Sequence, residues 1–262
     1  MKLNILRANP AGNITLFVLD PVEREQRAAV AARLMAIAEL KAEQVGFLCP
    51  ATQGGDGRME MMGGEFCGNA TRAFGMLLAQ KAKGQEQMQV ETSGCDHVVA
   101  VAVNLSAGTA RTEMPLPRWA KRKTVGGHQG TLVHLGGIAH LVVESAPPSQ
   151  AFFEQAEPIF REIPGLDAYG VIFLNKDDGG MTPLVKVPAT NTLIWEGSCG
   201  SGSLAAAVAQ SMDAPDGPFV RDYRQPAGIV RAEVVRTNGA VVATYIGGPV
   251  TLDAPIEVEV QL

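Results

Sequence analysis

The amino-acid sequence predicts an α/β protein that is rich in strands and built from two related halves. Short runs of β-branched residues, separated by glycine and proline, recur along the 262-residue chain and are typical of strands joined by turns. Two similar segments, residues 65–70 and 197–202, each carry a Cys-Gly step ahead of a small, apolar helical run. Because the two steps lie about half a chain apart, they indicate a duplicated, two-domain architecture.

The composition fits a globular protein that binds a small molecule. Hydrophobic residues make up 46% of the chain, enough to build a sizeable core. Only 19% of residues are charged and the formal net charge is -5, which argues against nucleic acid or an anionic membrane surface as a partner. Residues 1–20 show neither a signal-peptide pattern nor an apolar run of membrane-spanning length, so we expect a cytoplasmic protein.

The N-terminal half is expected to begin with a strand at residues 14–19. Asp20 and Pro21 then supply an N-cap and a proline at the first helical position, which predicts a helix as far as about Lys41. The buried stripe of this helix would consist of Val30, Leu34 and Ile37. Glycine-rich loops at residues 53–58 and 63–64 lead to the first Cys-Gly step, and a helix follows it as far as about Leu78.

The remainder of the chain is expected to form short strands, one helix and a hairpin. Strands are predicted at residues 98–104, 131–134, 140–144, 171–174 and 184–187. A helix follows the second Cys-Gly step to about Val208, and Asn238-Gly239 between residues 234–236 and 241–245 favours a tight hairpin. We place the two domains at residues 1–116 and 117–262, and the C-terminal strand could complete the first domain.

The repeated Cys-Gly step points to acid–base chemistry. A cysteine directly before a helix lies near unpaired N–H groups and the positive end of the helix dipole, which favour the thiolate. The same groups suit a substrate carboxylate, with the amides of Gly68, Asn69, Gly200 and Ser201 as candidates. Two such sites facing each other would stabilise the charge that forms when an amino acid loses its α-proton. Inversion then needs one thiolate and one thiol, on opposite faces of the α-carbon.

Other interpretations remain open. The four cysteines show no CxxC spacing and the four histidines form no ligand pair, so we expect no metal site. Cys49 and Cys95 are interpreted as small, buried apolar residues. Both Cys-Gly steps could be tight helix starts without chemistry, but their pairing in similar contexts favours function. Pyridoxal phosphate is a competing electron sink, yet no lysine stands out as its anchor, so we expect no cofactor.

Taken together, these motifs resemble the diaminopimelate epimerase superfamily over essentially the whole chain. The segments that carry the resemblance are residues 11–13, 64–71 and 198–202. The resemblance implies two pseudo-symmetric domains, each a β-sheet or barrel around a central helix, with the active site in the interdomain cleft. It also implies catalysis by Cys67 and Cys199 without a cofactor, carboxylate binding by the four amides named above, a substrate contact by Asn13, and a homodimer.

Several departures argue against diaminopimelate as the substrate. Diaminopimelate epimerases usually carry Glu-Arg nine and eight residues before the second cysteine, where this chain has Thr190-Asn191. They also carry Gly-Asn-Pro-His where residues 137–140 read Gly-Ile-Ala-His, and an asparagine that here looks replaced around Met61. Those groups hold the amine and the distal polar end of diaminopimelate. His140 is interpreted as a hydrogen-bonding strand residue rather than a base.

A closer resemblance is to the histidine racemase branch, whose D-histidine feeds opine-type metallophore synthesis. The segments that carry it are residues 9–13, 43–47, 93–95, 193–196 and 225–226. In that branch Glu43 is a plausible contact for the substrate, because a carboxylate can accept an imidazole N–H and stabilise imidazolium. Glu43 could equally be a solvated charge at a helix end, and Asn13 an ordinary turn residue. Glu196 is a candidate active-site residue, since it precedes Cys199 by three positions.

The leading hypothesis is therefore a cofactor-independent racemase that inverts the α-carbon of histidine. One alternative is diaminopimelate epimerase with an altered distal pocket. Another is a phenazine-biosynthesis-type isomerase, which shares the superfamily fold but does not rely on a thiol pair. A non-enzymatic alternative is a binding protein or redox switch in which the two cysteines form a disulfide. The sequence leaves open which cysteine takes the proton from the L-isomer.

Overall fold

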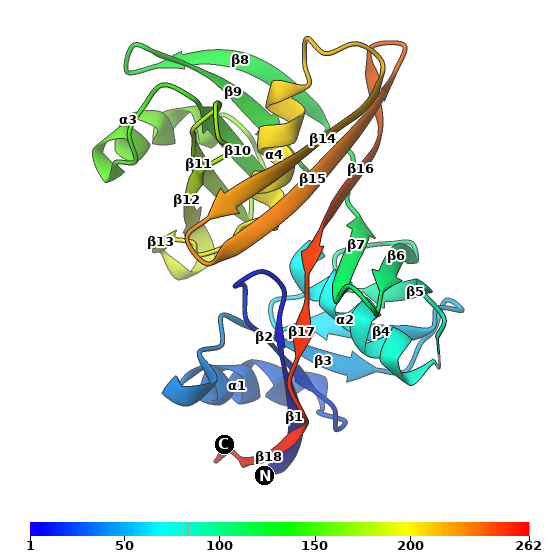
Figure 1. Cartoon of the computed structure of the whole chain (residues 1–262). Coiled ribbons are helices and arrows are strands. Elements are labelled where there is room, and N and C mark those ends of the chain that lie inside the picture. The colour runs from blue at the N-terminus through cyan, green and yellow to red at the C-terminus, as the bar shows by residue number, and fades with distance from the viewer. Residues whose placement is uncertain (83, 262) are drawn as a thin grey trace. The chain divides into compact units, whose positions relative to one another are not determined.

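The computed structural model describes residues 1–82 and 84–261, which fall into two compact units (Figure 1). Unit 1 comprises Met1–Glu113 together with the chain from Gly247 onward, and unit 2 comprises Met114–Ile246. The ranges predicted for the domains, 1–116 and 117–262, differ from these units chiefly because the chain from Gly247 packs with unit 1. The α/β fold class predicted from the sequence is confirmed, with many strands and few helices.

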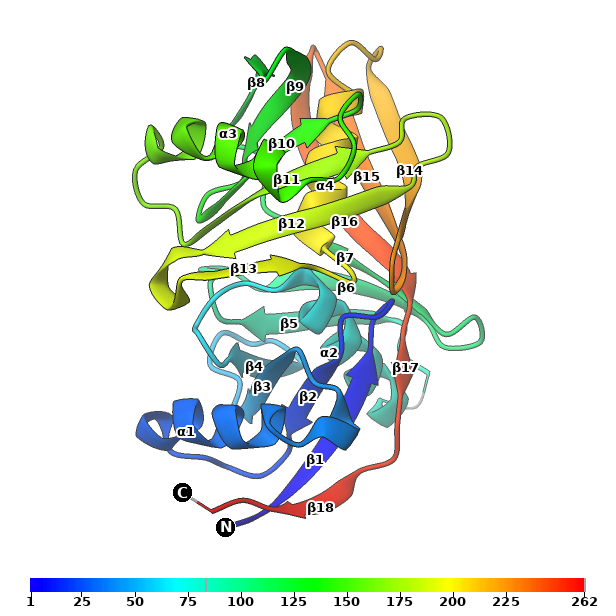
Figure 2. The ribbon, with the colours of Figure 1, turned by 90° about the vertical axis from the view of Figure 1, so that its left-hand side faces the viewer.

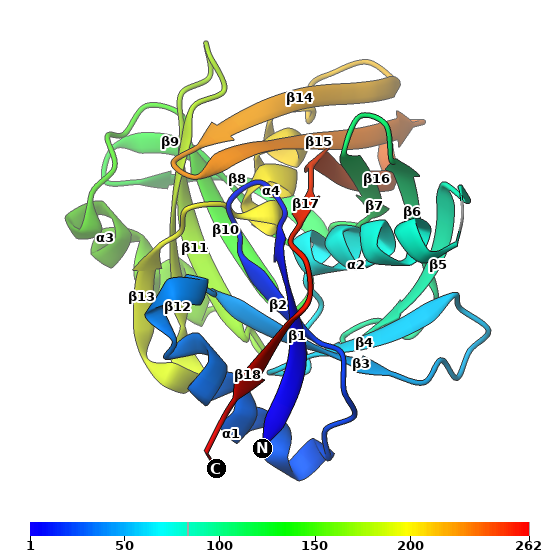
Figure 3. The same cartoon turned by 60° about the horizontal axis from the view of Figure 1, so that its bottom comes forward.

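Unit 1 is built on a mixed sheet. Its strands are β1 (Lys2–Asn9), β2 (Thr15–Val18), β3 (Gln44–Cys49), β4 (Gly57–Met61), β5 (Gln87–Thr92), β6 (Val99–Asn104), β7 (Thr109–Glu113), β17 (Thr251–Leu252) and β18 (Ile256–Glu259). They are ordered β7-β6-β5-β4-β3-β2-β1-β17, and β18 also pairs with β1 (Figure 3). The pairs β2–β3 and β4–β5 are parallel. The chain therefore closes unit 1 with its last strands.

Two helices pack against this sheet, α1 (Arg24–Met35) and α2 (Gly68–Lys81). Strand β2 is buried on both faces, because Leu16 joins the apolar cluster of α1 while Phe17 joins that of α2. Helix α2 contacts β5, β6 and β7, and residues 68–77 are all buried. At Gly75 a Cβ atom would lie 2.5 Å from Val101 Cγ1, so the glycine allows this close approach of helix and sheet.

The helix predicted from Asp20 to about Lys41 is only partly correct. Helix α1 begins at Arg24, and a separate 3-10 turn, Ala38–Leu40, follows it. The Asp20 carboxylate does not cap the helix, because it accepts the backbone N–H of Asn4 at 2.6 Å on β1. Val30 and Leu34 are buried as expected, whereas Ile37 lies beyond the helix and is half-buried.

Unit 2 contains a six-stranded sheet with the order β13-β12-β11-β10-β9-β8, and a second layer in which β15 lies between β14 and β16. The strands are β8 (Trp119–Val125), β9 (His128–His134), β10 (Ile138–Val143), β11 (Ala168–Leu174), β12 (Met181–Val187), β13 (Thr192–Trp195), β14 (Gly217–Gln225), β15 (Gly228–Thr237) and β16 (Ala240–Pro249), the last of which ends in unit 1. All five strands predicted beyond residue 97 fall within β6, β9, β10, β11 and β12, apart from single residues at their ends.

Two helices of unit 2 lie on opposite faces of the six-stranded sheet, α3 (Gln150–Arg161) and α4 (Gly200–Gln210) (Figures 1 and 2). Val171 and Phe173 of β11 join the cluster of α3, whereas Ile172 between them faces Gly202 of α4. Helix α4 also contacts β14 and β15 of the second layer. The helix predicted after the second Cys-Gly step is therefore covered by strands from two layers.

The predicted hairpin near the C-terminus is confirmed. Strands β15 and β16 flank Asn238 and Gly239, which have φ values of 51° and 75° as a type I′ turn requires. The sequence analysis missed β1, which precedes the strand expected to be first. No helix in residues 1–82 and 84–261 is long and apolar enough to cross a membrane.

Candidate functional site

Cys67 of unit 1 is the N-cap residue of α2, as its position before a helix predicts. Its backbone is extended, with φ -126° and ψ 106°, and its Sγ accepts a hydrogen bond from the Ala70 N–H at 3.5 Å. Its carbonyl oxygen accepts the N–H and the Oγ1–H of Thr71, at 2.9 and 2.8 Å. The sulfur therefore lies against the first-turn N–H groups of a buried helix.

Cys199 of unit 2 has nearly the same local geometry at the start of α4. Its φ is -118° and its ψ 108°, and its Sγ accepts the Gly202 N–H at 3.3 Å. Its carbonyl oxygen accepts a hydrogen bond from the Ser203 hydroxyl at 2.8 Å. The carbonyl oxygen of Cys67 accepts one from the Thr71 hydroxyl in the same way. The repeat seen in the sequence is thus a repeat of conformation, in which a sulfur atom caps a helix in each unit.

A glutamine fixes the start of α4. The backbone N–H of Cys199 donates to Gln225 Oε1 at 2.6 Å, and Gln225 Nε2 donates to Ser203 Oγ at 3.0 Å. A Cβ atom at Gly202 would lie 2.7 Å from Ile172 Cδ1 and 3.1 Å from the sulfur, so a larger residue here would displace one of these side chains. Gln225 entered the sequence analysis only through the family resemblance, because nothing in its residue type indicates a partner on a distant helix.

Glu196 lies beside Cys199, as its spacing suggests. Its side chain hydrogen-bonds the thiol, and both this bond and the negative charge of the carboxylate favour the protonated sulfur. Burial of Cys199 is the largest cause, and together these effects raise the pKa of Cys199 well above its usual value. Hydrogen bonds from the Ser201 hydroxyl and the Gly202 N–H act in the opposite direction and lower the pKa of Cys199. Burial and Glu196 therefore both favour the thiol form of Cys199.

Ser201 joins Cys199 to a buried histidine. Its Oγ lies 3.5 Å from Cys199 Sγ and 2.9 Å from His140 Nε2. His140 lies in β10 and is fully buried, which lowers its pKa to about 3. Its Nδ1 has no hydrogen-bond partner among the described residues. The imidazole is therefore neutral, and it shares a hydrogen bond with the Ser201 hydroxyl rather than acting as a proton donor in catalysis.

In unit 1, Asn13 and Glu43 belong to one hydrogen-bond network with Cys67. Asn13 Nδ2 donates to Glu43 Oε2 at 2.6 Å, and Gln44 Nε2 donates to Asn13 Oδ1 at 2.7 Å. The Gln44 side chain also hydrogen-bonds Cys67 and thereby favours the thiolate. Partial loss of hydration raises the pKa of Glu43, while the bond from Asn13 lowers it. Glu43 precedes β3 and does not end a helix, and the sequence analysis did not single out Gln44.

The expected effect of the helix start on Cys67 is present but is outweighed. The N–H groups of Ala70 and Asn69 and the side chain of Gln44 all lower the pKa of Cys67. Burial of the sulfur is the largest cause and raises this pKa, and the nearby Glu65 carboxylate adds to the rise. The helix start therefore favours the thiolate, as predicted, but desolvation acts in the opposite direction and is the larger effect.

The four amides proposed for carboxylate binding lie in two first helical turns. Gly68 and Asn69 begin α2, and Gly200 and Ser201 begin α4. N–H groups at these positions have no acceptor within their own helix and carry the positive end of the helix dipole. Each unit therefore presents a cysteine and a first helical turn in the same relative place.

The two remaining cysteines have no matching environment. Cys49 lies on β3, where Arg27 Nη2 donates to its sulfur at 3.4 Å. Burial raises the pKa of Cys95 to about 11, with Asp96 and Glu113 adding to the rise. In the described part of the chain all four cysteines are free, and no three His, Cys, Asp or Glu side chains gather where they could hold a metal ion.

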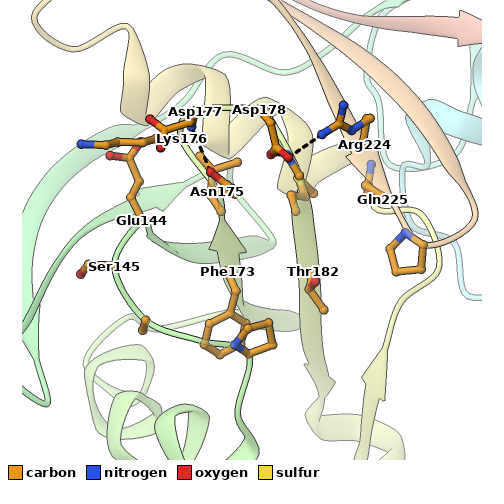
Figure 4. A pocket seen from close by; sticks show the side chains of 16 residues that line it. Glu144, Ser145, Phe173, Asn175, Lys176, Asp177, Asp178, Thr182, Arg224 and Gln225 are labelled. Atoms are coloured by element: carbon orange, nitrogen blue, oxygen red, sulfur yellow. Dashed lines mark hydrogen bonds and ion pairs between the residues drawn. The ribbon is translucent and has the colours of Figure 1, made fainter.

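Unit 2 contains a pocket of about 660 Å³ (Figure 4). Its walls come from residues 144–146, 148, 173–178, 180–182 and 224–226, and an ion pair of 2.6 Å joins Arg224 to Asp178 (Figure 4). Gln225, which holds the Cys199 N–H, belongs to its lining. Neither proposed catalytic cysteine lines this pocket, so the predicted site residues do not lie within it.

Comparison with known proteins identifies the family of this chain. A family model described as the histidine racemase CntK N-terminal domain matches residues 2–256. The chain is 28% identical to the histidine racemase of Fusobacterium nucleatum subsp. nucleatum over 267 aligned residues, which cover 98% of this chain and 94% of that protein. It is also 28% identical to the histidine racemase of Staphylococcus aureus (strain Mu50), over 93% of this chain and 92% of that protein.

A solved structure shows the same fold. The Bacillus anthracis phenazine biosynthesis protein of the PhzF family superposes with a TM-score of 0.70 at 14% sequence identity, covering 99% of this chain and 100% of that one. The family match extends over nearly the whole sequence and includes both Cys-Gly steps. The chain therefore belongs to the histidine racemase CntK N-terminal domain family and is an isomerase of the racemase and epimerase class.

Proposed function

We propose that this chain is a histidine racemase in which Cys67 and Cys199 are the two acid–base groups. The observation that carries the proposal is the matched geometry of the two sulfur atoms, each of which caps a buried helix and accepts the N–H three residues further on. Similarity to histidine racemases of two bacteria along almost the whole chain supports histidine as the substrate. Both lines of support point to proton transfer at an α-carbon.

The chemistry requires one thiolate and one thiol. The thiolate takes the α-proton, so that a C–H bond breaks, an S–H bond forms and the electron pair is delocalised into the substrate carboxylate. The thiol then gives its proton to the opposite face and is left as a thiolate. N–H groups of the two first helical turns would hold the carboxylate and stabilise the added charge. Turnover therefore exchanges the protonation states of the two cysteines.

This mechanism requires both sulfur atoms to flank one α-carbon. We therefore propose that the units act as two pseudo-symmetric domains of a diaminopimelate epimerase-like fold, each wrapped around its own helix, with the substrate bound in a cleft between them. The two thiols and the helix N–H groups supply both proton transfer and charge stabilisation, so the mechanism invokes no cofactor. We also propose that the protein is a cytoplasmic homodimer. Light scattering of the purified protein would test whether it is a dimer.

Glu43 is the proposed contact for the substrate side chain. Its carboxylate already accepts a hydrogen bond from Asn13, and because partial loss of hydration raises its pKa, a cationic partner would stabilise its charged form. An imidazole could donate an N–H to the same carboxylate. We expect Glu43→Gln to raise KM for histidine about tenfold or more, consistent with the loss of one charged hydrogen bond. Glu39→Gln, an exposed glutamate in the preceding 3-10 turn, is the matched control.

The site also argues against diaminopimelate. Where diaminopimelate epimerases carry a Glu-Arg pair, Thr190 here hydrogen-bonds Thr192 at 2.9 Å in a short 3-10 turn, and Asn191 adopts a left-handed conformation. Neither residue offers a charge to the distal carboxylate or amine of that substrate.

The proposal is tested by chiral chromatography of L-histidine and LL-diaminopimelate after incubation with the purified enzyme. We expect D-histidine to form without an added cofactor, and Cys67→Ala and Cys199→Ala each to abolish its formation. Preferential turnover of diaminopimelate would replace the proposed substrate, and full racemisation by both single variants would overturn the two-cysteine mechanism. If no amino acid is turned over and oxidation links the two cysteines, the redox-switch alternative is favoured.

A further inference from the structure

Each helix that begins after a proposed catalytic cysteine is followed in the chain by a hairpin of two antiparallel strands. Strands β5 and β6 follow α2 in unit 1, and β14 and β15 follow α4 in unit 2. Each helix packs against the hairpin that follows it. Because the first strand runs back along its helix, the turn of each hairpin lies near the start of that helix. The proposed mechanism assigns neither turn a role.

In unit 1 the turn after β5 holds the two residues that precede the first cysteine. The Ser93 hydroxyl donates to the Glu65 carbonyl oxygen at 2.7 Å and accepts the Met61 N–H at 2.8 Å. Gly94 has a φ of 71°, and a Cβ atom there would lie 2.3 Å from the Phe66 nitrogen. The turn therefore lies directly against the peptide group that joins Glu65 to Phe66.

In unit 2 the turn between β14 and β15 holds the chain as it enters α4. Gln225 Oε1 accepts the Cys199 N–H at 2.6 Å, and the Ala227 N–H donates to the Gly197 carbonyl oxygen at 2.9 Å. Ser198 lies between these two bonds, and its buried hydroxyl has no hydrogen-bond partner among the described residues. The hairpin, rather than the side chain of Ser198, therefore holds this segment.

Gln225 also orients the peptide groups on both sides of the Cys199 Cα atom. Its Nε2 donates to Ser203 Oγ at 3.0 Å, and this hydroxyl donates to the Cys199 carbonyl oxygen at 2.8 Å. Ser203 is fully buried and Gln225 is only 9% exposed, so water competes little for these bonds. Because the backbone sets the direction of the Cα–Cβ bond, these contacts limit where the sulfur can lie.

We propose that the two turns are matched positioning devices, in which Ser93 and Gly94 hold Cys67, and Gln225 holds Cys199, where each sulfur reaches the α-carbon. The inference rests on the proposed function, because it concerns the same two sulfur atoms. Misplacing a reacting group by about 1 Å can slow a reaction about 100-fold. Each turn is therefore expected to control the proton transfer made by its own cysteine.

The two isomers of histidine distinguish the two turns. The isomer whose α-hydrogen faces Cys67 loses it to that thiolate and receives another from the Cys199 thiol. If Cys199 is misplaced, the second transfer is slow, so the hydrogen on Cys67 exchanges with solvent and returns to the same face. This isomer then takes up solvent deuterium without inversion. The mirror-image isomer does not, because its first proton transfer already depends on Cys199.

The test measures deuterium uptake at the α-carbon and inversion separately for L-histidine and D-histidine in heavy water, by chiral chromatography and mass spectrometry. We expect Gln225→Met to lower racemisation about tenfold or more and to raise uptake without inversion for one isomer only. Ser93→Ala and Gly94→Ala should raise it for the opposite isomer. A loss of stability alone would lower all rates together, so the reversal of isomers is the signature of positioning.

Two exposed residues supply matched controls. Gln129→Met on β9 and Ser106→Ala in the turn after β6 should leave the reactions of both isomers unchanged. If Gln225→Met does not fold, as circular dichroism would show, Ser203→Ala replaces it, because it removes the partner of the Gln225 amide and should affect the same isomer. Hydrogen exchange of the Cys199 amide, followed by NMR of protein isotope-labelled only at cysteine, should be faster in Gln225→Met.

The outcomes separate this inference from the proposed function. If the wild type racemises histidine but the variants of either turn keep its rates, or both turns favour uptake in the same isomer, the inference is wrong and the proposed function stands. Unchanged exchange of the Cys199 amide in Gln225→Met would also overturn the inference, without any turnover. Absence of racemisation by the wild type would reject the proposed function, on which the inference rests.

Discussion

At the level of single residues, two opposing effects act on each proposed catalytic sulfur. The N–H groups of a first helical turn favour the thiolate at Cys67 and at Cys199. Burial favours the thiol at both and is the larger effect. A bound carboxylate would accept hydrogen bonds from some of these N–H groups. Exclusion of water from the site would strengthen every remaining charge interaction. The neighbouring side chains, Gln44 at Cys67 and Glu196 at Cys199, then distinguish the two sulfurs.

His140 leads to a pH prediction for stability. Its pKa in the folded protein is about 3, below its ordinary value of 6.5, so the unfolded chain binds a proton that the folded chain does not. The contribution of neutral His140 to the free energy of unfolding is therefore fully present above pH 6.5 and is lost as the pH falls toward 3. At pH 5 the loss is ~2 kcal/mol. We expect His140→Gln to remove this part of the acid-side loss in denaturant unfolding measured at several pH values. Equal slopes in the two proteins would contradict a neutral, buried imidazole.

These residue-level features were only partly predictable. The Cys-Gly repeat identified both sulfurs, and spacing identified Glu196, because they lie close together in the sequence. Gln44 and Gln225 gave no signal of their own by residue type, since their roles depend on partners brought near by folding. Burial could not be read from the motif either, so the direction of the pKa shifts at both cysteines could not be predicted.

At the level of elements, the two capped helices differ at the position whose N–H donates to the sulfur. The first motif has Ala70 where the second has Gly202, and both N–H groups donate to the sulfur. A methyl group at position 202 would meet Ile172 and Cys199, whereas Ala70 is accommodated in unit 1. The strand that covers each helix therefore decides which residue fits there.

Gly202→Ala is expected to displace the start of α4 and lower histidine racemisation at least tenfold, because the added methyl group would press on the sulfur. Ala70→Gly is the matched control in the other motif. It keeps the N–H donor and should cost about 1 kcal/mol of stability through helix propensity, with most of the activity retained. Comparable activity of Gly202→Ala and the wild type, measured by chiral chromatography, would show that the close packing around Gly202 is not required.

Elements with a strong local pattern were the ones that the sequence predicted. The hairpin at Asn238-Gly239 and strands such as β11 follow from turn chemistry and β-branched runs. The start of α1 was missed because Asp20 bonds to Asn4 on a neighbouring strand, which is a tertiary contact that outcompetes the cap. Strand β1 carries the alternation of polar and buried residues that is typical of a strand, so it could have been predicted, whereas its partners β17 and β18 come from the far end of the chain and could not.

At the level of the whole molecule, the chain returns to unit 1 after completing unit 2. Strand β18 pairs with β1, the N-terminal amino group donates to the Val260 carbonyl oxygen at 2.7 Å, and Val260 is buried with Leu3 and Ile5. Arg7 also forms an ion pair of 3.0 Å with Asp253. These contacts tie the two ends of the sequence into one core, which supports treating each unit as a domain.

A chain that ends at Val250 is therefore expected to lose hydrogen-exchange protection selectively. The amides of β1 and β2 should exchange faster because their edge partners and the Val260 contact are gone. The amides of β9 to β12 in unit 2 should keep their protection. Loss of protection in both units to the same extent would contradict the assignment of the C-terminal strands to unit 1 alone.

The most direct test of the two-cysteine account follows deuterium during the first turnovers of L-histidine in heavy water. If one group removes the α-proton and a second delivers another from the opposite face, the D-histidine formed early carries solvent deuterium while the remaining L-histidine keeps its hydrogen. We predict this pattern for the wild type, with no D-histidine from Cys67→Ser or Cys199→Ser. Deuterium entering both isomers at equal rates from the start, or D-histidine that retains the original hydrogen, would contradict it.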